Sequence, residues 1–466
     1  MNGTEPPMNL QMDLIREAFH YRSRFAGSTM VFKIDFPVTL DPAFPSLMKD
    51  LALLAQTGFR VAVVPGAKEW IDSVLEEYGV LSGYAPPDPD PPSAPAGTGR
   101  IPALGGEPLR ITGERAMPFV EMAAFHVATR FMTALSANRC DSVIGNFVRA
   151  RGLGVVGGRD MENTGRVHRI LTGPMGKVLD LGMIPILPCI GWGPSGKPYN
   201  VPSGEIALAA SAALGAVKLF IVSAGKVLKD LETPGDMETG EGGRIIRLTP
   251  KEAEAALNLN APGGRAESLA ALRLALDASK AGVERIHLID GREEGAVLRE
   301  LFSNLGSGTM VYADEYEAIR PLKTQDIPDI LRIMEPLMRQ GILLRRGPAE
   351  IQEKKEDYWV FGIDGRAHAC GALHCWEDRQ GEIAAVAVDS AYADMGLGSR
   401  MVRFLINRAA REGLRRVFAL TTKTQDWFET LGFKEQDPAS LPEGRKKIYS
   451  PERKSKIYVL ELEGSG

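Results

Sequence analysis

The sequence predicts an α/β fold in two domains: an open, mostly parallel sheet sandwiched by helices, followed by a smaller α+β domain. Apolar strand-like runs alternate with helical runs between residues 28 and 312, which is typical of a parallel sheet with crossover helices. After residue 318 several strand-like segments come in succession before helix–strand units resume, which indicates a second domain. We therefore expect one domain at 1–315 and another at 318–466.

The elements of the first domain follow from periodicity and from helix-breaking residues. Residues 10–25 carry apolar side chains at helical spacing, and Gly58 ends a helix that begins near residue 47. The proline-dense segment 85–97 cannot donate ladder hydrogen bonds, so we expect an exposed insertion there. The remaining predicted elements are strands at 28–36 and 60–67, helices at 71–79 and 117–137, a hairpin-like segment at 143–160, helix–strand units at 176–190, 203–225 and 267–291, and a helix with an edge strand at 294–312.

The second domain begins with a strand and a pair of helices. Three β segments follow, at 358–365, 367–377 and 381–389. A glycine-containing turn then precedes a helix at 399–412, a strand, a short helix and a final strand.

Composition excludes several classes of function. The chain has 466 residues, of which 44% are hydrophobic and 24% charged, and its formal net charge is -4. Such a chain has no basic field to attract nucleic acid or an anionic membrane. It shows neither a signal-peptide pattern nor an apolar stretch of the roughly 20 residues that a membrane helix needs, so we expect a cytoplasmic protein.

Four scattered cysteines do not form a disulfide framework: Cys140, Cys189, Cys370 and Cys375. The cluster of Cys370, His374 and Cys375 could hold a metal, but no second ligand pair follows at zinc-like spacing. We therefore expect buried thiols and no metal.

One glycine motif matches a dinucleotide-binding pattern but lacks its structural context. Gly152, Gly154 and Gly157 fit G-x-G-x-x-G, which binds dinucleotides only between a strand and a helix. The residues that follow are turn-like, so a hairpin bend explains these glycines better.

The most informative segment is a strand, Ile383 to Val388, that leads through a turn to Gly396-Leu397-Gly398-Ser399 and a helix. Glycines before a helix let backbone N–H groups and the helix N-terminus bind a phosphate. This pattern resembles the GNAT acetyltransferases. The resemblance implies that Gly396, Leu397, Gly398 and Ser399 hold the pyrophosphate of coenzyme A, and that Val386, Ala387 and Val388 hold the acetyl-thioester arm. The chain departs from the family at Ala393, where Gln or Arg is usual.

Five blocks in order narrow the resemblance to the N-acetylglutamate synthase family: QGILLRR (340–346), GEIAAVAV (381–388), FALTTKTQDWFETLGF (418–433), LPEGRKKIY (441–449) and RKSK (453–456). The family transfers an acetyl group from acetyl-CoA to L-glutamate, the first step of arginine biosynthesis.

The resemblance also implies roles for individual residues. Amine acetylation needs a general base, and Glu382 occupies the position that resembles the family's base. Arg345 and Arg453 match the family's substrate-binding arginines, whose guanidinium groups suit carboxylates, and Lys423 lies near them in the pattern. Ser455 matches the residue that supports the leaving thiolate. His368 and His374 read as packed residues.

Residues 16–312 resemble the N-acetylglutamate kinase branch of the amino-acid kinases, most clearly at 283–309 and 198–219. The kinase pattern is broken at three places. Lys33 is followed by Ile-Asp-Phe in place of x-Gly-Gly, Pro65-Gly66-Ala67 replaces the second phosphate loop, and Gly204 stands where the family has an aspartate. Phosphoryl transfer depends on positioned charge, so we expect no kinase activity.

In arginine-sensitive members of that branch, L-arginine binds between the N-terminal helix and the C-terminal part of the domain. Tyr21, His287, Glu300, Gly306 and Gly308 fall on positions that resemble this allosteric site. The same N-terminal helix interlaces subunits in that branch, which implies a homo-oligomer such as a hexamer.

Two alternatives remain open at this stage. The first is a GNAT enzyme for another acidic amino acid. The second is an arginine-binding regulatory module with a degenerate transferase, which the departure at Ala393 supports and the intact Glu382, Gly396 and Gly398 oppose.

Overall fold

The chain separates into two compact units, Met1–Ala313 and Asp314–Gly466. The computed structural model describes residues 25–85, 109–225, 228, 231–232, 245–260, 266–302, 307–312, 317–363, 366–390, 392, 397–453 and 455–462. The expected helix at 10–25 and the proline-dense insertion at 85–97 lie outside these residues, apart from Phe25 and Ala85. In the described part of the chain, no helix combines the length and the apolar character that crossing a lipid bilayer requires.

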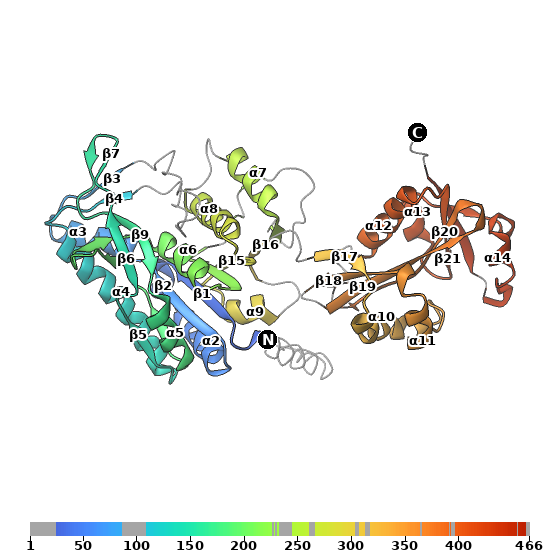
Figure 1. Ribbon diagram of the computed structural model, residues 1–466, viewed down its shortest axis with the longest axis horizontal. Helices are drawn as coiled ribbons and strands as arrows, with labels where there is room; N and C mark the ends of the chain where they lie inside the picture. The colour runs from blue at the N-terminus through green and yellow to red at the C-terminus, as the bar shows by residue number, and fades with distance from the viewer. Residues whose placement is uncertain are drawn as a thin grey trace, which may run out of the picture. The chain divides into compact units, whose positions relative to one another are not determined.

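The first unit is built on an eight-stranded sheet in the order β14-β16-β15-β13-β1-β2-β10-β5 (Figure 1). Neighbouring strands run parallel except for β15 and β16, which are antiparallel. The expected mostly parallel sheet is therefore confirmed. Its strands are β1 (Thr29–Ile34), β2 (Arg60–Pro65), β5 (Ser142–Ile144), β10 (Ile184–Ile186), β13 (Lys218–Ser223), β14 (Arg247–Leu248), β15 (Arg285–Asp290) and β16 (Thr309–Tyr312).

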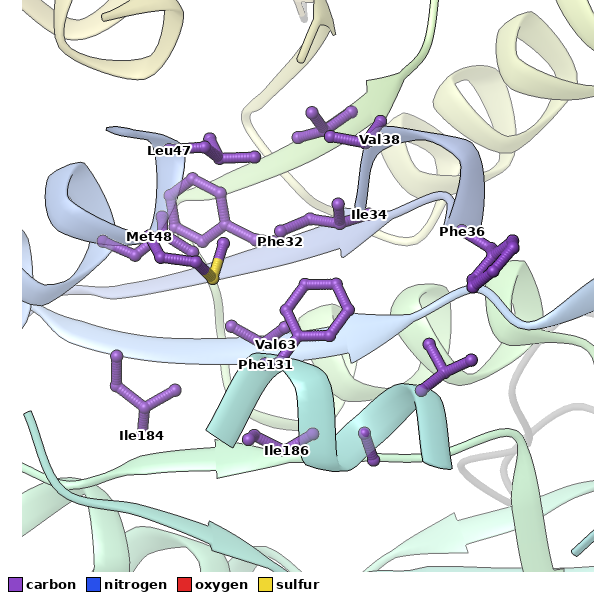
Figure 2. Close-up of a cluster of buried hydrophobic side chains, with 14 of the residues drawn as sticks. Phe32, Ile34, Phe36, Val38, Leu47, Met48, Val63, Phe131, Ile184 and Ile186 are labelled. Atoms are coloured by element: carbon purple, nitrogen blue, oxygen red, sulfur yellow. The ribbon is translucent and has the colours of Figure 1, made fainter. Parts of the chain in front are cut away.

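Two hydrophobic cores cover the two faces of this sheet, because successive side chains of a strand point to opposite faces. Met30, Phe32 and Ile34 of β1 enter one core, and Val31, which lies between Met30 and Phe32, enters the other. Figure 2 shows the first core, where Phe32, Val63 and Phe131 meet. Helices α2 (Phe44–Gln56), α3 (Lys68–Glu77), α4 (Met117–Ala137) and α9 (Ala296–Phe302) line the first core, and α5 (Thr172–Asp180), α6 (Ser203–Ala213), α7 (Pro250–Asn260) and α8 (Ala266–Lys280) line the second.

A smaller four-stranded sheet and two short ribbons complete the first unit. Gly152 ends β6, and Gly154 and Gly157 adopt positive φ angles of 68° and 57° around the β7–β8 hairpin. The glycine motif therefore forms a hairpin bend, as expected. The strands are β6 (Val148–Gly152), β9 (Gly165–Ile170), β11 (Ile190–Trp192) and β12 (Pro198–Asn200) in the small sheet, with ribbons β7 (Val155–Val156) with β8 (Arg159–Asp160) and β3 (Gly83–Ala85) with β4 (Leu109–Ile111).

The second unit has a seven-stranded mixed sheet in the order β17-β18-β19-β20-β21-β23-β22. Neighbours are antiparallel except β20 and β21, which are parallel. This arrangement confirms the α+β prediction. The strands are β17 (Glu317–Pro321), β18 (Tyr358–Ile363), β19 (Arg366–Trp376), β20 (Gln380–Val388), β21 (Arg416–Thr421), β22 (Lys434–Gln436) and β23 (Lys456–Glu461).

Helices cover both faces of this second sheet (Figure 1). On one face α12 (Leu397–Arg411) and α13 (Gln425–Thr430) bury Leu373 and Ile383. On the other face α10 (Ile327–Arg339) and α11 (Pro348–Glu353) cover Tyr358 and Ala372. Beside them, a separate small core packs the segment before α14 (Glu443–Lys446) against Phe418. The second face is therefore covered in two parts.

Candidate active site

Strands β20 and β21 are paired for only part of their length. Their parallel register covers three residues of β20, Gln380 to Glu382, opposite Arg416 to Phe418. From Ile383 to Val388, β20 is paired with β19 alone. The sheet therefore opens between β20 and β21 immediately after Glu382, and the backbone of β20 beyond that point has a free edge on this side.

A bulge bends β20 within this open part. Ala385 has a φ of 53°, in the left-handed region that non-glycine residues rarely adopt. The register between β19 and β20 shifts between Cys370 and Ala372, and the Cys370 thiol donates to the Ala385 carbonyl oxygen at 3.4 Å. A bulge increases the local twist of a strand, so it re-aims the backbone of Val386, Ala387 and Val388 that follows.

The N-terminus of α12 lies close to the end of β20. A side chain at Gly398 would contact Trp427 at 3.4 Å and Val388 at 3.5 Å, so these three residues are packed together. The Trp427 indole N–H donates to Ser399 Oγ at 3.3 Å. The first turn of α12 contains no acidic residue, which leaves the helix N-terminus suited to an anion. Gly396 and Ala393 lie outside the described residues.

Glu382 is buried and fully engaged at the point where the strands separate. Its Oε2 accepts hydrogen bonds from Arg445 Nε at 2.8 Å and from Trp376 Nε1 at 3.2 Å, and its Oε1 accepts one from Arg445 Nη2 at 3.0 Å. The side chains of Glu382 and Arg445 are only 10% and 8% exposed. Glu382 is therefore an oriented internal carboxylate rather than a strand-end carboxylate in solvent.

Another arginine, Arg453, lies close enough to Arg445 to be affected by its charge. Arg453 Nη2 donates to the carbonyl oxygens of Gly341 at 3.2 Å and Ile342 at 2.8 Å, which joins the α10–α11 loop to the C-terminal segment. Burial, and then the charges of Arg346 and Arg445, lower the pKa of Arg453. The three guanidinium groups therefore share one electrostatic environment, and this basic region is suited to an acidic ligand.

The two adjacent arginines of the α10–α11 loop differ in burial. Arg345 is exposed, whereas the side chain of Arg346 is only 11% exposed and its Nε lies 4.0 Å from Glu350 Oε1. Lys423 is also exposed, in the turn after β21, where its backbone N–H donates to Thr421 Oγ1 at 3.3 Å.

Ser455 is buried directly before β23, and its carbonyl oxygen accepts a hydrogen bond from the Tyr449 hydroxyl at 3.1 Å. Because Lys456 is paired with Thr421, Ser455 lies beside the end of β21, on the strand that flanks the opening.

The two histidines of β19 have partners of their own. His374 Nδ1 lies 2.6 Å from Asp357 Oδ2, and its ring meets Tyr358 edge-on. His368 packs against Tyr392, with ring centroids 4.4 Å apart. Both are packed residues, as expected. Among the residues that the structure describes, no three His, Cys, Asp or Glu side chains are grouped to hold a metal.

Sequence reasoning missed Arg346, Arg445 and Trp376 as site residues. Arg445 stands in the conspicuous LPEGRKKIY block, but α14 has only four residues and gives no periodic pattern that would predict a buried arginine. Trp376 could have been found from strand alternation, because His374, Trp376 and Glu382 lie on one face of the β19–β20 ribbon.

The first unit contains a second group of interacting polar residues. His287 Nδ1 lies 2.7 Å from Glu300 Oε1, while the backbone N–H groups of Ser307 and Gly308 donate to Glu300 Oε2 at 2.7 and 2.9 Å. Burial and the charge of Lys218 lower the pKa of His287 to about 4. Burial alone would raise the pKa of Glu300, but these hydrogen bonds hold it at about 2. Tyr21 and Gly306 lie outside the described residues.

The degenerate kinase positions are engaged in internal contacts. Lys33 forms an ion pair with Asp35, and Asp35 Oδ2 accepts a hydrogen bond from Ser223 Oγ at 3.1 Å. A side chain at Gly66 would come within 3.1 Å of the same aspartate. Asp35, which stands in place of a glycine of the kinase pattern, therefore occupies the space beside Gly66 and neutralises Lys33.

Two family patterns match this chain. The acetyltransferase (GNAT) family matches residues 327–433, and the amino acid kinase family matches residues 31–290.

Relatives match this chain over nearly its whole length. An amino-acid acetyltransferase of Shewanella oneidensis is 31% identical over 463 residues and an amino-acid acetyltransferase of Vibrio cholerae is 31% identical over 467 residues, with at least 96% of this chain and 97% of each relative covered. The N-acetylglutamate synthase of Neisseria gonorrhoeae complexed with coenzyme A and L-arginine is 28% identical, has a TM-score of 0.80, and covers 97% of this chain and 99% of its own. The same enzyme complexed with coenzyme A and N-acetyl-glutamate is 29% identical, with a TM-score of 0.58 and the same coverage.

Proposed function

Because this chain belongs to the amino-acid acetyltransferase family, we propose that it acetylates L-glutamate with acetyl-CoA to give N-acetyl-L-glutamate and coenzyme A, the first step of arginine biosynthesis. The observation that carries the proposal is the buried Glu382 at the opening between β20 and β21, paired with Arg445, whose charge, like that of Arg346, acts on Arg453. A site with more guanidinium groups than carboxylates suits an amino acid with two carboxylates.

We propose that acetyl-CoA binds along the open edge of β20. The unpaired backbone N–H and C=O groups of Val386, Ala387 and Val388 would form hydrogen bonds with the pantetheine amides. The N-terminus of α12, at Leu397, Gly398 and Ser399, would hold the pyrophosphate together with Gly396. The lack of a side chain at Gly398, between Val388 and Trp427, fits a close approach of the phosphates. The two parts of the co-substrate would thus be bound by adjacent segments.

Glu382 serves as the general base in this proposal. It takes a proton from the ammonium group of the substrate, directly or through water, and the neutral amine attacks the thioester carbon. The C–N bond forms as the C–S bond breaks, and the second proton of the attacking nitrogen passes to the departing thiolate of coenzyme A, which leaves as the thiol with support from Ser455. Arg453, Lys423 and the adjacent pair Arg345 and Arg346 supply the positive charge for the two carboxylates.

Transfer proceeds directly from acetyl-CoA to the amine. Burial raises the pKa of the nearby Cys370 thiol to about 12, and its hydrogen is donated to Ala385. A thiol in this state is a poor nucleophile, since the thiolate is the reactive form. This supports a ternary complex without an acetyl-cysteine intermediate.

The kinase-like unit, residues 1–315 in our assignment, would serve as the sensor for feedback by L-arginine, and 318–466 as the transferase. His287, Glu300 and Gly308, with Tyr21 and Gly306, would form the effector site, because a buried carboxylate suits a guanidinium group. Feedback then requires a coupling between two distinct sites. The ion pair of Lys33 with Asp35 supports the proposal that this unit binds an effector and does not transfer phosphate.

The test is thiol release from acetyl-CoA by the full-length protein with L-glutamate, L-aspartate or other amino acids, and with and without L-arginine. Release that depends on L-glutamate supports the proposal. Release with L-aspartate but not L-glutamate would retain the acetyltransferase and reject this substrate, and an L-arginine effect on the rate would test the sensor separately.

A further inference from the structure

Arg445 holds Glu382 by a bidentate interaction inside the site. The two oxygens of a carboxylate offer about four acceptor positions. Oε2 accepts from Arg445 Nε at 2.8 Å and from Trp376 Nε1 at 3.2 Å, and Oε1 accepts from Arg445 Nη2 at 3.0 Å. Both positions on Oε2 are therefore occupied, whereas Oε1 retains one.

The arrangement restrains the rotation of the carboxylate. Arg445 lies on α14 and Trp376 on β19, so two elements besides β20 determine the plane of the Glu382 carboxylate. Arg445 is itself well buried, and planar guanidinium groups match a carboxylate with two parallel hydrogen bonds. The remaining acceptor position on Oε1 is thereby held in a fixed direction.

We infer that Arg445 is a positioning residue for the transfer, which orients Glu382 so that its Oε1 atom receives the proton of the substrate amine. The inference rests on the proposed role of Glu382 as base. In this arrangement the Nε and one Nη2 hydrogen of Arg445 are committed to Glu382, so we assign it the orientation of the base rather than of the substrate. The substrate carboxylates are assigned, as in the proposed function, to Arg453, Lys423 and the arginines of the α10–α11 loop.

The experiment compares kcat and KM for L-glutamate in the full-length wild type with those of R445K, R445A and W376F. A lysine keeps the charge of Arg445 but cannot form the bidentate pair. R445K is expected to lower kcat about tenfold or more, while KM stays within about threefold, because the loss concerns the transition state. R445A is expected to lower kcat about 10²-fold, and W376F to lower it less than either.

A matched control exists in the same unit. Arg320 of β17 forms a bidentate pair with the buried Asp326, with Nη1 at 2.6 Å and Nη2 at 2.9 Å from its two oxygens. R320K removes an equivalent pair outside the site, so it is expected to alter the melting temperature but to leave kcat and KM unchanged. An equal fall of kcat in R320K and R445K would overturn the inference, because general loosening of the unit would then explain both.

Chemical rescue separates a positioning role from a structural one. Guanidinium chloride at a non-denaturing concentration is expected to restore part of kcat in R445A, whereas urea at the same concentration is not. If R445A does not fold, R445K and W376F decide the question. A rise in KM with unchanged kcat would overturn the inference, because Arg445 would then bind the substrate. If the wild-type protein releases no thiol with L-glutamate, the proposed function is rejected. If the wild type is active and E382Q is inactive, but R445K has the kcat and KM of the wild type, only this inference is rejected.

Discussion

Gly308 lies so close to the backbone oxygen of Leu288 that a Cβ atom at position 308 would overlap it. The same glycine donates its N–H to Glu300, so the absence of a side chain holds the loop against β15 and beside the buried carboxylate. The space at this position is set by backbone atoms, which cannot move aside as a flexible side chain can.

The variant G308A is therefore expected to lower the free energy of unfolding by about 1–3 kcal/mol, the usual cost of forcing extra atoms into packed space. Chemical denaturation followed by circular dichroism measures this change. The matched control is G173A, where a Cβ atom meets nothing within 4 Å and the glycine has no positive φ. Equal stability of G308A and G173A would contradict the predicted clash.

The interaction of His287 with Glu300 leads to a prediction for the effector response. E300Q removes the negative charge that a guanidinium ligand would need and weakens hydrogen bonds to a charged acceptor, which are worth about 1.5–3 kcal/mol each. We expect this variant to lose any response of thiol release to L-arginine while retaining activity in its absence. Isothermal titration with L-arginine gives a second readout, and an unchanged response would remove Glu300 from the proposed effector site.

The adjacent arginines of the α10–α11 loop are expected to differ. Arg346 is largely buried and its charge affects Arg453, whereas Arg345 is exposed. R346Q is therefore expected to raise KM for L-glutamate about tenfold or more, since a hydrogen bond to a charged group contributes about 1.5–3 kcal/mol. Steady-state kinetics of R346Q and R345Q decide between them, and a larger effect of R345Q would favour the residue that the family resemblance selects.

Glu205 makes the stability of the first unit depend on pH. Burial raises the pKa of this α6 carboxyl to about 7, against the lowering effect of the Arg166 charge. Since the folded-state pKa exceeds the unfolded value, the stabilisation is complete below about pH 4.5 and is lost as the pH rises through about 7. A shift of this size corresponds to about 3 kcal/mol.

E205Q is isosteric, and its amide oxygen can still accept the Val167 N–H bond. We expect E205Q to be more stable than wild type at pH 8 and to lose this advantage near pH 4.5, as measured by urea denaturation at both values. A difference between the two proteins that does not change with pH would contradict this assignment.

The buried Cys370 thiol gives a prediction for the catalytic route. If transfer is direct, C370A is expected to retain kcat within about threefold, because no covalent bond to this sulfur is formed. Mass spectrometry of wild type mixed with acetyl-CoA alone should then show no acetylated Cys370. A loss of activity in C370A together with an acetylated wild-type residue would establish an acetyl-enzyme instead.

Sequence patterns predicted the elements that depend on periodicity. The strand containing Glu382, the glycine bend at Gly154 and Gly157, and the order of strands and helices in both units follow from alternation, spacing and breakers. Arg445 and Arg346 could not be predicted as buried, because their burial depends on which loops meet over the sheet. The bulge at Ala385 could not be predicted either, since it results from a register shift against β19 rather than from its own residue type.

Because β20 and β21 separate, the sheet of the transferase unit leaves backbone hydrogen-bonding groups of β20 without a neighbouring strand. Between the two strands lies a seam where water must satisfy backbone groups that a neighbouring strand would otherwise satisfy. A co-substrate with amide groups along an extended arm can take the place of the missing strand. The stability of this unit should therefore rise with the concentration of coenzyme A, by the ordinary linkage between binding and folding. Heat or denaturant should then open the empty enzyme first along this seam.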